Sequence, residues 1–514
     1  MTTLLKKQDL IDATGNIIEF HQIVPSPYVI NGPTDQHSFY RKLINMQLCN
    51  PITKLPENIY LKRLSLVETV LGEKTAQAKL ESPKKNAKSW SSNYGTHGWH
   101  RYVGRFPPHL VRSLLNYFQA DSRDLVLDPF AGSGTTLVEC RLLGIPAIGV
   151  EICPLSALIS RAKSQFTLEL ANYIPELTSD FEKFYKSTWN SFIKGREFSS
   201  ISYDEIISRP GNLISAFSNY EKWLTKKALL GVSIAVEFAN HLSGEYRDLF
   251  LVALSSKMRS IGNVDVDVVR AEYSKKPREK VDVLDLLMKQ LRKMRQSIID
   301  SYSSHSDFPI TNNNITVIEN DILKVDNIKK ESISYIITSP PYGVEAISYL
   351  RTHLLSYRVL EHFLGTDPYK FSDSVIGSEY LPGQAPDVND FTVANLSPTY
   401  KKFFDHINSK NLNKNLTLRK FMMMKFFEDI KRVTARFQEW LKVNGKVAFI
   451  IGNNKIGSDV IPTHEIICEI FKAYNLILED SIKHKLKTNN SNSQVPWQDR
   501  VIDEEYLLIF CKKG

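Results

Sequence analysis

A glycine-rich stretch in the first third of the chain has the residue types and spacing to hold a nucleoside. Leu125–Cys140 reads as a buried strand, a sharp turn with Gly132 and Gly134, and the first turns of a helix. Glycines let the backbone lie against a ligand, and amides at a helix N-terminus favour oxygen-rich groups. The next strand ends at Glu151, where a carboxylate can accept hydrogen bonds from both hydroxyls of a ribose. An ordinary strand–turn–helix unit is the alternative interpretation.

A second motif follows a predicted buried strand in the C-terminal half: Thr338, Ser339, Pro340, Pro341 and Tyr342. Consecutive prolines fix φ twice and lack backbone donors, so the carbonyl groups there are acceptors with little freedom to move. The oxygen of Ser339 adds an acceptor, and Tyr342 offers a flat face against which an extruded base can stack. This set can hold both N–H groups of an aromatic amine and orient its nitrogen towards an electrophile, without a covalent nucleophile. Alone, the motif also fits a proline-rich turn.

Together the two motifs resemble those of the DNA methyltransferases that modify exocyclic amino groups with S-adenosylmethionine. The turn lacks the third glycine of a dinucleotide-binding fold and is similar to the cofactor motif of that family. Serine in the first place of the second motif looks like the cytosine-N4 branch, whereas Asp or Asn there looks more like adenine-N6. Besides Glu151, the resemblance implies cofactor contacts from the turn residues Asp128, Pro129, Phe130, Gly132, Gly134 and Thr135.

The resemblance implies roles for two further places. Arg105, Phe106 and Pro107 precede a predicted helix and are similar, more loosely, to the family's element over the methionine end of the cofactor. Asp321 follows the predicted strand 315–318, where the family has an Asp that accepts a hydrogen bond from the adenine amine. A helix cap or turn residue is the alternative for Asp321. His97 and His100 could suggest a metal site, but no cluster of Cys or carboxylate residues completes a set of ligands, so we expect no metal.

Other classes of enzyme fit these motifs less well. Enzymes that methylate C5 of cytosine attack with a Cys that follows Pro, but here Cys153 precedes Pro154 and no Pro-Cys pair occurs. Cytosine-N4 enzymes often carry the Ser-Pro-Pro-Tyr motif before the glycine motif. The reversed order here keeps adenine-N6 methylation open as an alternative. Two more distant alternatives are an RNA guanine-N2 methyltransferase and a non-enzymatic nucleic-acid-binding protein on the same fold.

The composition indicates the kind of binding partner and the cellular compartment of the protein. The 514 residues are 42% hydrophobic and 24% charged, which excludes a disordered or fibrous protein, and the net charge of +9 favours a polyanion such as double-stranded DNA. The 5 cysteines contain no CxxC pair, as in a reduced cytoplasm. We expect no membrane segment and no signal peptide. The resemblance also implies a cognate restriction endonuclease that acts on the same DNA site as this protein. The sequence does not indicate the oligomeric state.

The resemblance and the strand–helix pattern predict an α/β chain. We expect a Rossmann-like class I S-adenosylmethionine-dependent methyltransferase fold with a mixed seven-stranded sheet and a large helical insertion, which we expect to face DNA. The chain is divided as follows: 1–92, a region of unknown role; 93–164, cofactor motifs; 165–310, the helical insertion; 311–364, the catalytic motif; 365–415, a loop-rich insertion near the catalytic end; 416–514, the rest of the catalytic domain.

Overall fold

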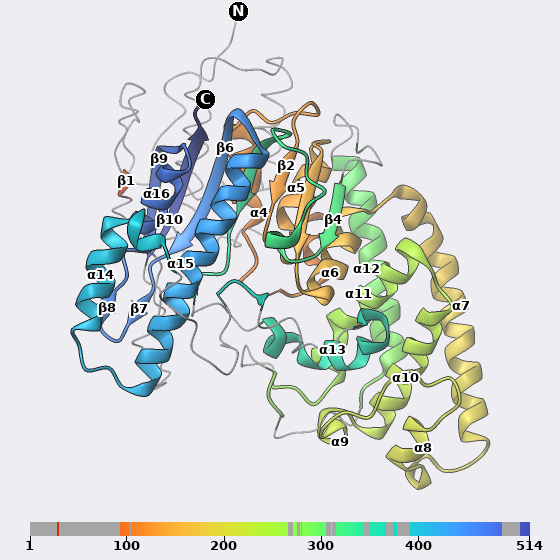
Figure 1. Cartoon of the computed structure of the whole chain (residues 1–514). Helices are drawn as coiled ribbons and strands as arrows, with labels where there is room; N and C mark the ends of the chain where they lie inside the picture. Colours follow the sequence, from red (N-terminus) through yellow and green to blue (C-terminus); the bar gives the residue numbers. More distant parts are fainter. Residues whose placement is uncertain are drawn as a thin grey trace, which may run out of the picture.

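A central sheet with helices on both faces and a block of helices beyond one edge make up the described part of the chain (Figure 1). The structure is a computed structural model. It describes residues 28–29, 93–102, 104–265, 271–274, 278, 280–304, 310, 315–343, 349–365, 374–377, 391–485 and 504–514. Most of the region 1–92, much of the basic loop 275–280 and the polar loop 488–493 lie outside these residues.

The sheet has the strand order β1-β9-β10-β6-β5-β2-β3-β4. Its strands are β1 (Tyr28–Val29), β2 (Val126–Asp128), β3 (Ala147–Glu151), β4 (Ile315–Glu319), β5 (Ile333–Thr338), β6 (Leu441–Gly452), β9 (Leu476–Lys485) and β10 (Glu504–Lys512). β10 is antiparallel to both of its neighbours, and the other adjacent strands are parallel. The mixed α/β sheet of the predicted class is therefore confirmed. The sheet has eight strands where seven were predicted, because the two-residue edge strand β1 adds one.

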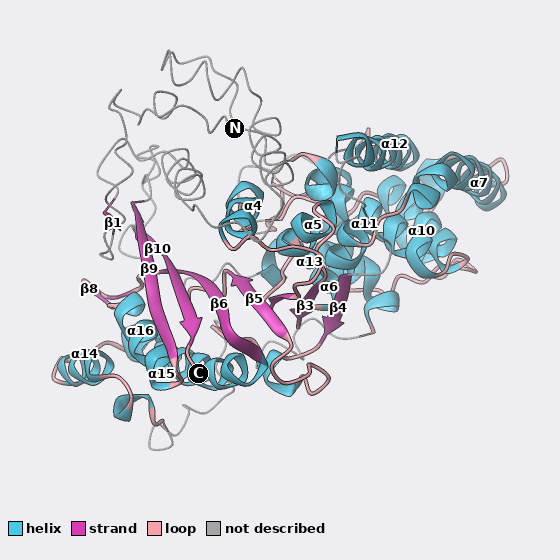
Figure 2. Cartoon of the chain, turned by 90° about the horizontal axis from the view of Figure 1, so that it is seen from above, coloured by secondary structure: helices cyan, strands magenta, loops and turns pink. Residues whose placement is uncertain are grey.

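Helices cover both faces of this sheet, as Figure 2 shows. α4 (Pro108–Tyr117) and α5 (Thr135–Leu142) pack on one face, and α15 (Lys414–Trp440) and α16 (Thr463–Ala473) pack on the other. Every residue of β5 is buried, because a parallel strand between two helical layers has no face towards water. The three methionines at 422–424 pack in or against this core.

The helical block follows β3 and forms the largest apolar cluster. Its helices are α6 (Pro154–Ser164), α7 (Leu168–Ile193), α8 (Tyr203–Ile207), α9 (Tyr220–Trp223), α10 (Lys226–Asn240), α11 (Gly244–Ile261) and α12 (Val283–Ser304), joined by α13 (Tyr349–Leu364) from after the catalytic motif. An apolar stripe on α12 belongs to the core: Leu287, Leu291, Met294 and Ile298 are buried and Leu284 packs against them. That this block faces DNA stays a prediction.

Part of the region expected to be loop-rich is helical. α14 (Pro398–Asn408) and the 3-10 helix η8 (Val393–Asn395) lie between 391 and 408. The hydroxyl of Ser397 accepts a hydrogen bond from the amide of Tyr400, and Pro398 occupies the first helical position. A Ser-Pro pair at a helix start was therefore a local signal that the loop prediction overlooked. The hairpin of β7 (Lys455–Ile456) and β8 (Asp459–Val460) was also not anticipated.

Candidate functional site

The predicted motifs meet at one edge of the sheet because the strands that precede them are parallel. β2 ends at Asp128, β3 at Glu151, β5 at Thr338 and β6 at Gly452. The chain runs from β2 to β3 on one side and returns to β5 on the other, so the strand order reverses between β2 and β5. In open α/β sheets, ligands bind in the crevice outside the carboxyl ends of strands at such a reversal.

The carboxylate of Asp128 joins the glycine turn to the catalytic motif. Its Oδ1 accepts a hydrogen bond from the hydroxyl of Thr338 at 2.8 Å and from the amide of Phe130 at 3.2 Å. Its Oδ2 accepts from the hydroxyl of Thr136 at 2.6 Å. Burial raises the pKa of Asp128 to about 6, and these three donors oppose the rise. Asp128 thus fixes the two motifs relative to each other, and its predicted contact with a cofactor stays a prediction.

The two glycines of the turn serve different purposes. Both have positive φ, 52° for Gly132 and 78° for Gly134. A Cβ added to Gly134 would lie 2.4 Å from the hydroxyl of Ser160, so this glycine lets α5 approach α6. Lys163 supports the turn between them: its fully buried Nζ donates to the carbonyl of Ser133 at 2.8 Å. Burial holds the pKa of Lys163 well below its usual value. Sequence reasoning did not identify Lys163.

We expect Gly134→Ala to destabilise the protein more than Gly195→Ala. Gly195 has a similar φ of 75°, but its added Cβ would meet no atom within 4 Å. Both substitutions carry the backbone strain of a left-handed conformation, about 1 kcal/mol. Only Gly134→Ala adds steric overlap with α6, which costs about 1–3 kcal/mol more. Thermal unfolding of the two variants measures the difference. Equal melting temperatures would contradict the close approach of α5 and α6.

Glu151, the last residue of β3, contacts the backbone of the glycine turn. Its Oε2 accepts a hydrogen bond from the amide of Gly132 and its Oε1 from the amide of Cys153, both at 2.8 Å. Burial raises the pKa of Glu151 to about 7, opposed by these amides and reinforced by the charge of Asp128. A carboxylate has about four lone-pair sites, so each oxygen retains acceptor capacity for a ligand hydroxyl. The residue is half-buried.

Asp321 lies on the neighbouring strand end, two residues beyond β4. Glu319 at the end of β4 pairs in register with Glu151. The Oδ1 of Asp321 accepts the amide of Leu323 at 3.0 Å and caps the 3-10 helix η4 (Ile322–Lys324). Asp321 is therefore a helix cap, which was the alternative interpretation of this residue. A cap oxygen keeps a second lone pair, so the predicted hydrogen bond with adenine stays a prediction.

Hydrogen bonds within the segment before α4 hold Arg105 in place. Arg105 donates through Nη1 to the carbonyl of His97 at 2.7 Å and through Nη2 to the side chain of Asn93 at 3.3 Å. Phe106 is buried in the core under α4, and Pro107 is the residue before the first turn of that helix. Burial lowers the pKa of Arg105. Their predicted contact with the cofactor stays a prediction.

Tyr102, which sequence reasoning did not single out, approaches the turn from this segment. Its ring lies 3.7 Å from where a Cβ on Gly132 would stand. Its hydroxyl shares a hydrogen bond of 2.8 Å with the hydroxyl of Ser156, and its ring stacks on His353 of α13. An aromatic residue among other aromatics gives no sequence signal of such a contact.

His97 belongs to a buried ion network. Glu139 accepts hydrogen bonds from Nε of Arg112 at 2.5 Å and from the hydroxyl of Tyr94 at 2.6 Å, and His97 Nε2 lies 2.7 Å away. Burial alone would raise the pKa of Glu139, but these partners together lower it to about 2. Burial lowers the pKa of His97 to about 3, so the ring is neutral. The network ties the 3-10 helix η2 (Gly95–Trp99) to α4 and α5.

Cys153 precedes Pro154 instead of following a proline, as the nucleophile of C5-cytosine enzymes does. Its surroundings do not favour a reactive thiolate. Its thiol lies 2.7 Å from the hydroxyl of Tyr357, and burial raises its pKa to about 12. Because the thiolate is the reactive form, this sulfur is inert at neutral pH.

The catalytic motif is held in place at its tyrosine. The hydroxyl of Ser339 donates to the hydroxyl of Tyr342 at 3.2 Å, which leaves the serine oxygen its acceptor lone pairs. Asn454, just past β6, donates through Nδ2 to the carbonyl of Tyr342. Pro340 is buried, and the side chains on either side of it are half-buried. The acceptors predicted from the sequence therefore lie at the same strand edge as the glycine turn.

A glycine of the loop-rich region packs against this motif. A Cβ added to Gly377 would lie 3.1 Å from the carbonyl oxygen of Gly343 and 3.2 Å from Cβ of Pro341. Residues 374–377 therefore lie at the catalytic end of the sheet, as expected for this region. Residues 366–373 and 378–390 of the same insertion lie outside the described residues.

We expect Asn454→Asp to slow methyl transfer about 10- to 100-fold while changing cofactor affinity little. The substitution keeps the size of the side chain but turns the donor to the carbonyl of Tyr342 into an acceptor, which displaces the motif. Asn453→Asp is the matched control, because Oδ1 of Asn453 already serves as the acceptor for His464. Single-turnover rates and calorimetric cofactor titrations separate the two effects. Equal rates for both variants would show that Asn454 does not position the motif.

The chain is similar in sequence to known DNA methyltransferases. Residues 33–156 match a family model of N6/N4 methyltransferases described as "DNA methylase". The Type II methyltransferase M.MvaI of Kocuria varians is 24% identical over 398 residues, which cover 74% of this chain and 82% of that protein. M.BsoBI of Geobacillus stearothermophilus is 24% identical and covers 55% of each chain. A tRNA (guanine(10)-N2)-dimethyltransferase of Methanothermobacter thermautotrophicus is 37% identical over only 51 residues, 10% of this chain. Among the described residues, no helix is long and apolar enough to cross a membrane.

Proposed function

Because the chain belongs to the family of DNA amino-methyltransferases, we propose that it methylates the N4 amine of a cytosine flipped out of double-stranded DNA. The observation that carries the proposal is the hydrogen bond between Thr338 and Asp128, which joins the glycine turn that we assign to the cofactor directly to the Ser-Pro-Pro-Tyr motif. The serine at position 339 favours cytosine-N4 over the alternative, adenine-N6. By analogy with the Type II enzymes, we further propose that the methylated site is one that a restriction endonuclease would otherwise cut.

The residues at the end of β3 fit the cofactor of this family, S-adenosylmethionine. Each oxygen of Glu151 accepts one amide hydrogen bond and keeps acceptor capacity, which a ribose with two hydroxyls would use. The turn itself has positive φ at Gly132 and no side chain between its backbone and Tyr102. We assign the ribose to Glu151 and the adenine amine to Asp321. When bound, the cofactor supplies a methyl group already activated by its sulfonium.

Because the methyl group is already activated, the protein has only to position the weakly nucleophilic nitrogen of the base. The oxygen of Ser339 and the carbonyl of Pro340 would accept the two N–H groups of the cytosine amine, and Tyr342 would stack on the base. This arrangement would leave the nitrogen lone pair free to face the activated methyl group. The nitrogen would form the new N–C bond as the S–CH3 bond of the sulfonium breaks, which leaves a neutral thioether, and the nitrogen would release one proton to solvent. Correct placement of two reacting groups can contribute about 7–11 kcal/mol of the barrier reduction.

Transfer of a labelled methyl group tests the proposed substrate. The protein is incubated with radiolabelled S-adenosylmethionine and either unmethylated genomic DNA or tRNA. We expect label in DNA and a site that sequencing can identify, and we expect DNA methylated at that site to resist a restriction enzyme that cuts there. Label confined to tRNA would overturn the DNA assignment and favour the RNA alternative. Binding of cofactor with no label in either acceptor would favour a non-enzymatic protein on the same fold.

A further inference from the structure

A tyrosine of α13, the helix that follows the catalytic motif, contacts the residues just after Glu151. The hydroxyl of Tyr357 shares a hydrogen bond of 2.7 Å with the sulfur of Cys153 and accepts another, at 3.3 Å, from the amide of Leu155. Tyr357 is buried, and burial raises the pKa of its hydroxyl well above the usual value. The hydroxyl thus satisfies one of the first amides of α6, which have no partner within that helix.

Cys153 connects this tyrosine to the carboxylate of Glu151. Its backbone amide donates to Oε1 of Glu151 at 2.8 Å. Its sulfur also accepts a hydrogen bond from the hydroxyl of Ser156 at 3.0 Å, and that hydroxyl shares a hydrogen bond of 2.8 Å with the hydroxyl of Tyr102. Four side chains therefore form one continuous hydrogen-bonded series, which we call the polar chain: Tyr102, Ser156, Cys153 and Tyr357.

The polar chain contacts both residues whose amides donate to Glu151. One donor is Gly132, and the ring of Tyr102 lies 3.7 Å from where a Cβ on this glycine would stand. The other donor is Cys153, which belongs to the chain itself. Tyr102 in turn stacks on His353 of α13, with ring centroids 5.4 Å apart. Helix α13 therefore supports the polar chain at both of its ends.

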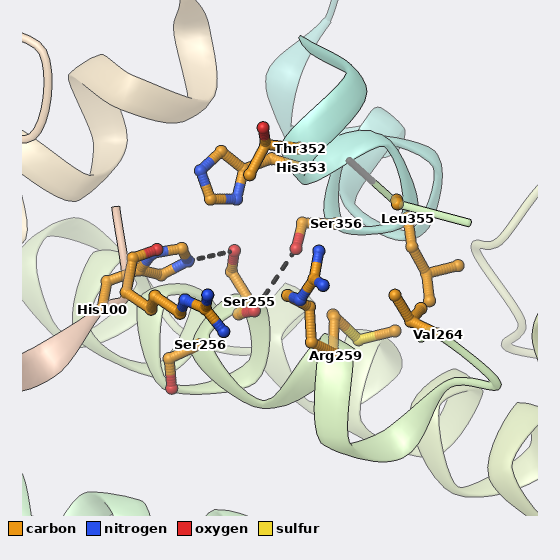
Figure 3. Close-up of a pocket in the computed structure, with 12 residues that line it drawn as sticks. His100, Ser255, Ser256, Arg259, Val264, Thr352, His353, Leu355 and Ser356 are labelled. Carbon is orange, nitrogen blue, oxygen red and sulfur yellow. Dashed lines mark hydrogen bonds between the residues drawn. The ribbon is translucent and has the colours of Figure 1, made fainter. Parts of the chain in front are cut away.

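A neighbouring side chain attaches α13 to the helical block. The hydroxyl of Ser356 donates to the carbonyl of Ser255 on α11 at 3.3 Å, and the hydroxyl of Ser255 lies 2.9 Å from Nε2 of His100 (Figure 3). Consecutive residues of α13 thus contact different helices, because Ser356 bonds to α11 and Tyr357 bonds to the start of α6. This attachment fixes the place of the Tyr357 hydroxyl.

We propose that Tyr357 is a positioning residue of the cofactor site, which through Cys153 holds the carboxylate of Glu151 in the orientation that binds the ribose. The inference rests on the proposed function, which assigns the ribose to Glu151, and extends it to a residue outside the cofactor motifs. A carboxylate that is oriented before the ligand arrives loses less conformational entropy on binding. Hydrogen bonds from a supporting layer of residues supply such orientation.

Calorimetric titration of Tyr357→Phe with S-adenosylmethionine tests this proposal. The variant keeps the ring but loses the hydrogen bonds to Cys153 and Leu155, so we expect the Kd of the cofactor to rise about three- to ten-fold. The single-turnover rate at saturating cofactor should change by less than about two-fold, because the lost interaction serves binding. Tyr400→Phe is the matched control: Tyr400 is buried in α14, and its hydroxyl has no hydrogen-bond partner within the described structure.

Substitutions of Cys153 separate positioning from packing. Cys153→Ala removes the sulfur that joins Tyr357 to the amide on Glu151, and it should raise the Kd of the cofactor as much as Tyr357→Phe does. In the double variant the two effects should not add, because both remove the same contact. Cys153→Ser keeps a hydrogen-bonding atom at this place and should retain most of the affinity.

Three results would overturn the proposal. The first is a lower melting temperature of Tyr357→Phe with a wild-type Kd, measured well below the unfolding transition, because Tyr357 would then serve stability alone. The second is an equal loss of affinity in Cys153→Ala and Cys153→Ser. The third is a slower single turnover with an unchanged Kd. A wild type that does not bind S-adenosylmethionine would instead overturn the proposed function.

Discussion

Tyr342→Ala should lower the kcat/KM for DNA methylation between about 5-fold and about 150-fold and leave cofactor affinity unchanged. Stacking of a base on an aromatic side chain contributes about 1–3 kcal/mol, and the substitution removes that surface from the proposed base site. The carbonyl of residue 342, which accepts the hydrogen bond from Asn454, is retained in the alanine variant. Steady-state methylation of DNA and calorimetric titration with the cofactor measure the two quantities.

Tyr342→Phe is the matched control for this effect. It removes the hydroxyl that accepts a hydrogen bond from Ser339 but keeps the ring. If stacking is the role of Tyr342, the phenylalanine variant keeps most of the activity. An equally large loss in both variants would assign the role to the hydroxyl. Weakened cofactor binding in the alanine variant would place the ring in the cofactor site.

Glu151→Gln should weaken cofactor binding about 10- to 100-fold. The amide has the shape of the carboxylate but lacks its charge and one of its acceptors, and each hydrogen bond to a charged group contributes about 1.5–3 kcal/mol. Glu169→Gln is the matched control, because Glu169 is exposed in the first turn of α7, outside the glycine turn, and it should leave affinity unchanged. Wild-type affinity in Glu151→Gln would contradict the assignment of the ribose to this residue.

The raised pKa of Glu151 adds a pH dependence to the same comparison. With a pKa of about 7, the carboxylate of the free protein gains a proton as the pH falls from 8 to 6, so wild-type cofactor affinity should fall over that range. A carboxyl group with a raised pKa contributes stability that is present below its unfolded value of 4.5 and is lost as the pH rises through 7. The melting temperature of Glu151→Gln relative to the wild type should therefore rise between pH 5 and pH 8.

Local sequence patterns were sufficient to predict the strand ends and the motifs attached to them. The glycines at 132 and 134, the acidic residue at 151 and the paired prolines are each distinctive in type and spacing. The mixed sheet followed from the family resemblance, because periodicity alone does not order strands. The helix α14 was missed since Asp, Asn and Ser dominate its surroundings, although Ser397 and Pro398 marked its start.

The contacts that join the motifs could not be read from the sequence. Asp128 and Thr338 are 210 positions apart, and no local pattern pairs them. Lys163 looks like an ordinary charged residue of a helix, yet it is buried under the glycine turn. Asn454 follows β6 as an ordinary polar residue, and its contact with Tyr342 depends on the register of β5 and β6. These interactions arise from tertiary packing rather than from local propensity.

The chemical identity of the methylated nucleoside tests the central claim most directly. DNA labelled by the protein is digested to nucleosides and separated by chromatography against standards. We predict that the label elutes with N4-methylcytosine, as Ser339 in the first position of the motif indicates. Label in N6-methyladenine would keep the amine-methylating mechanism and contradict the assignment of the base.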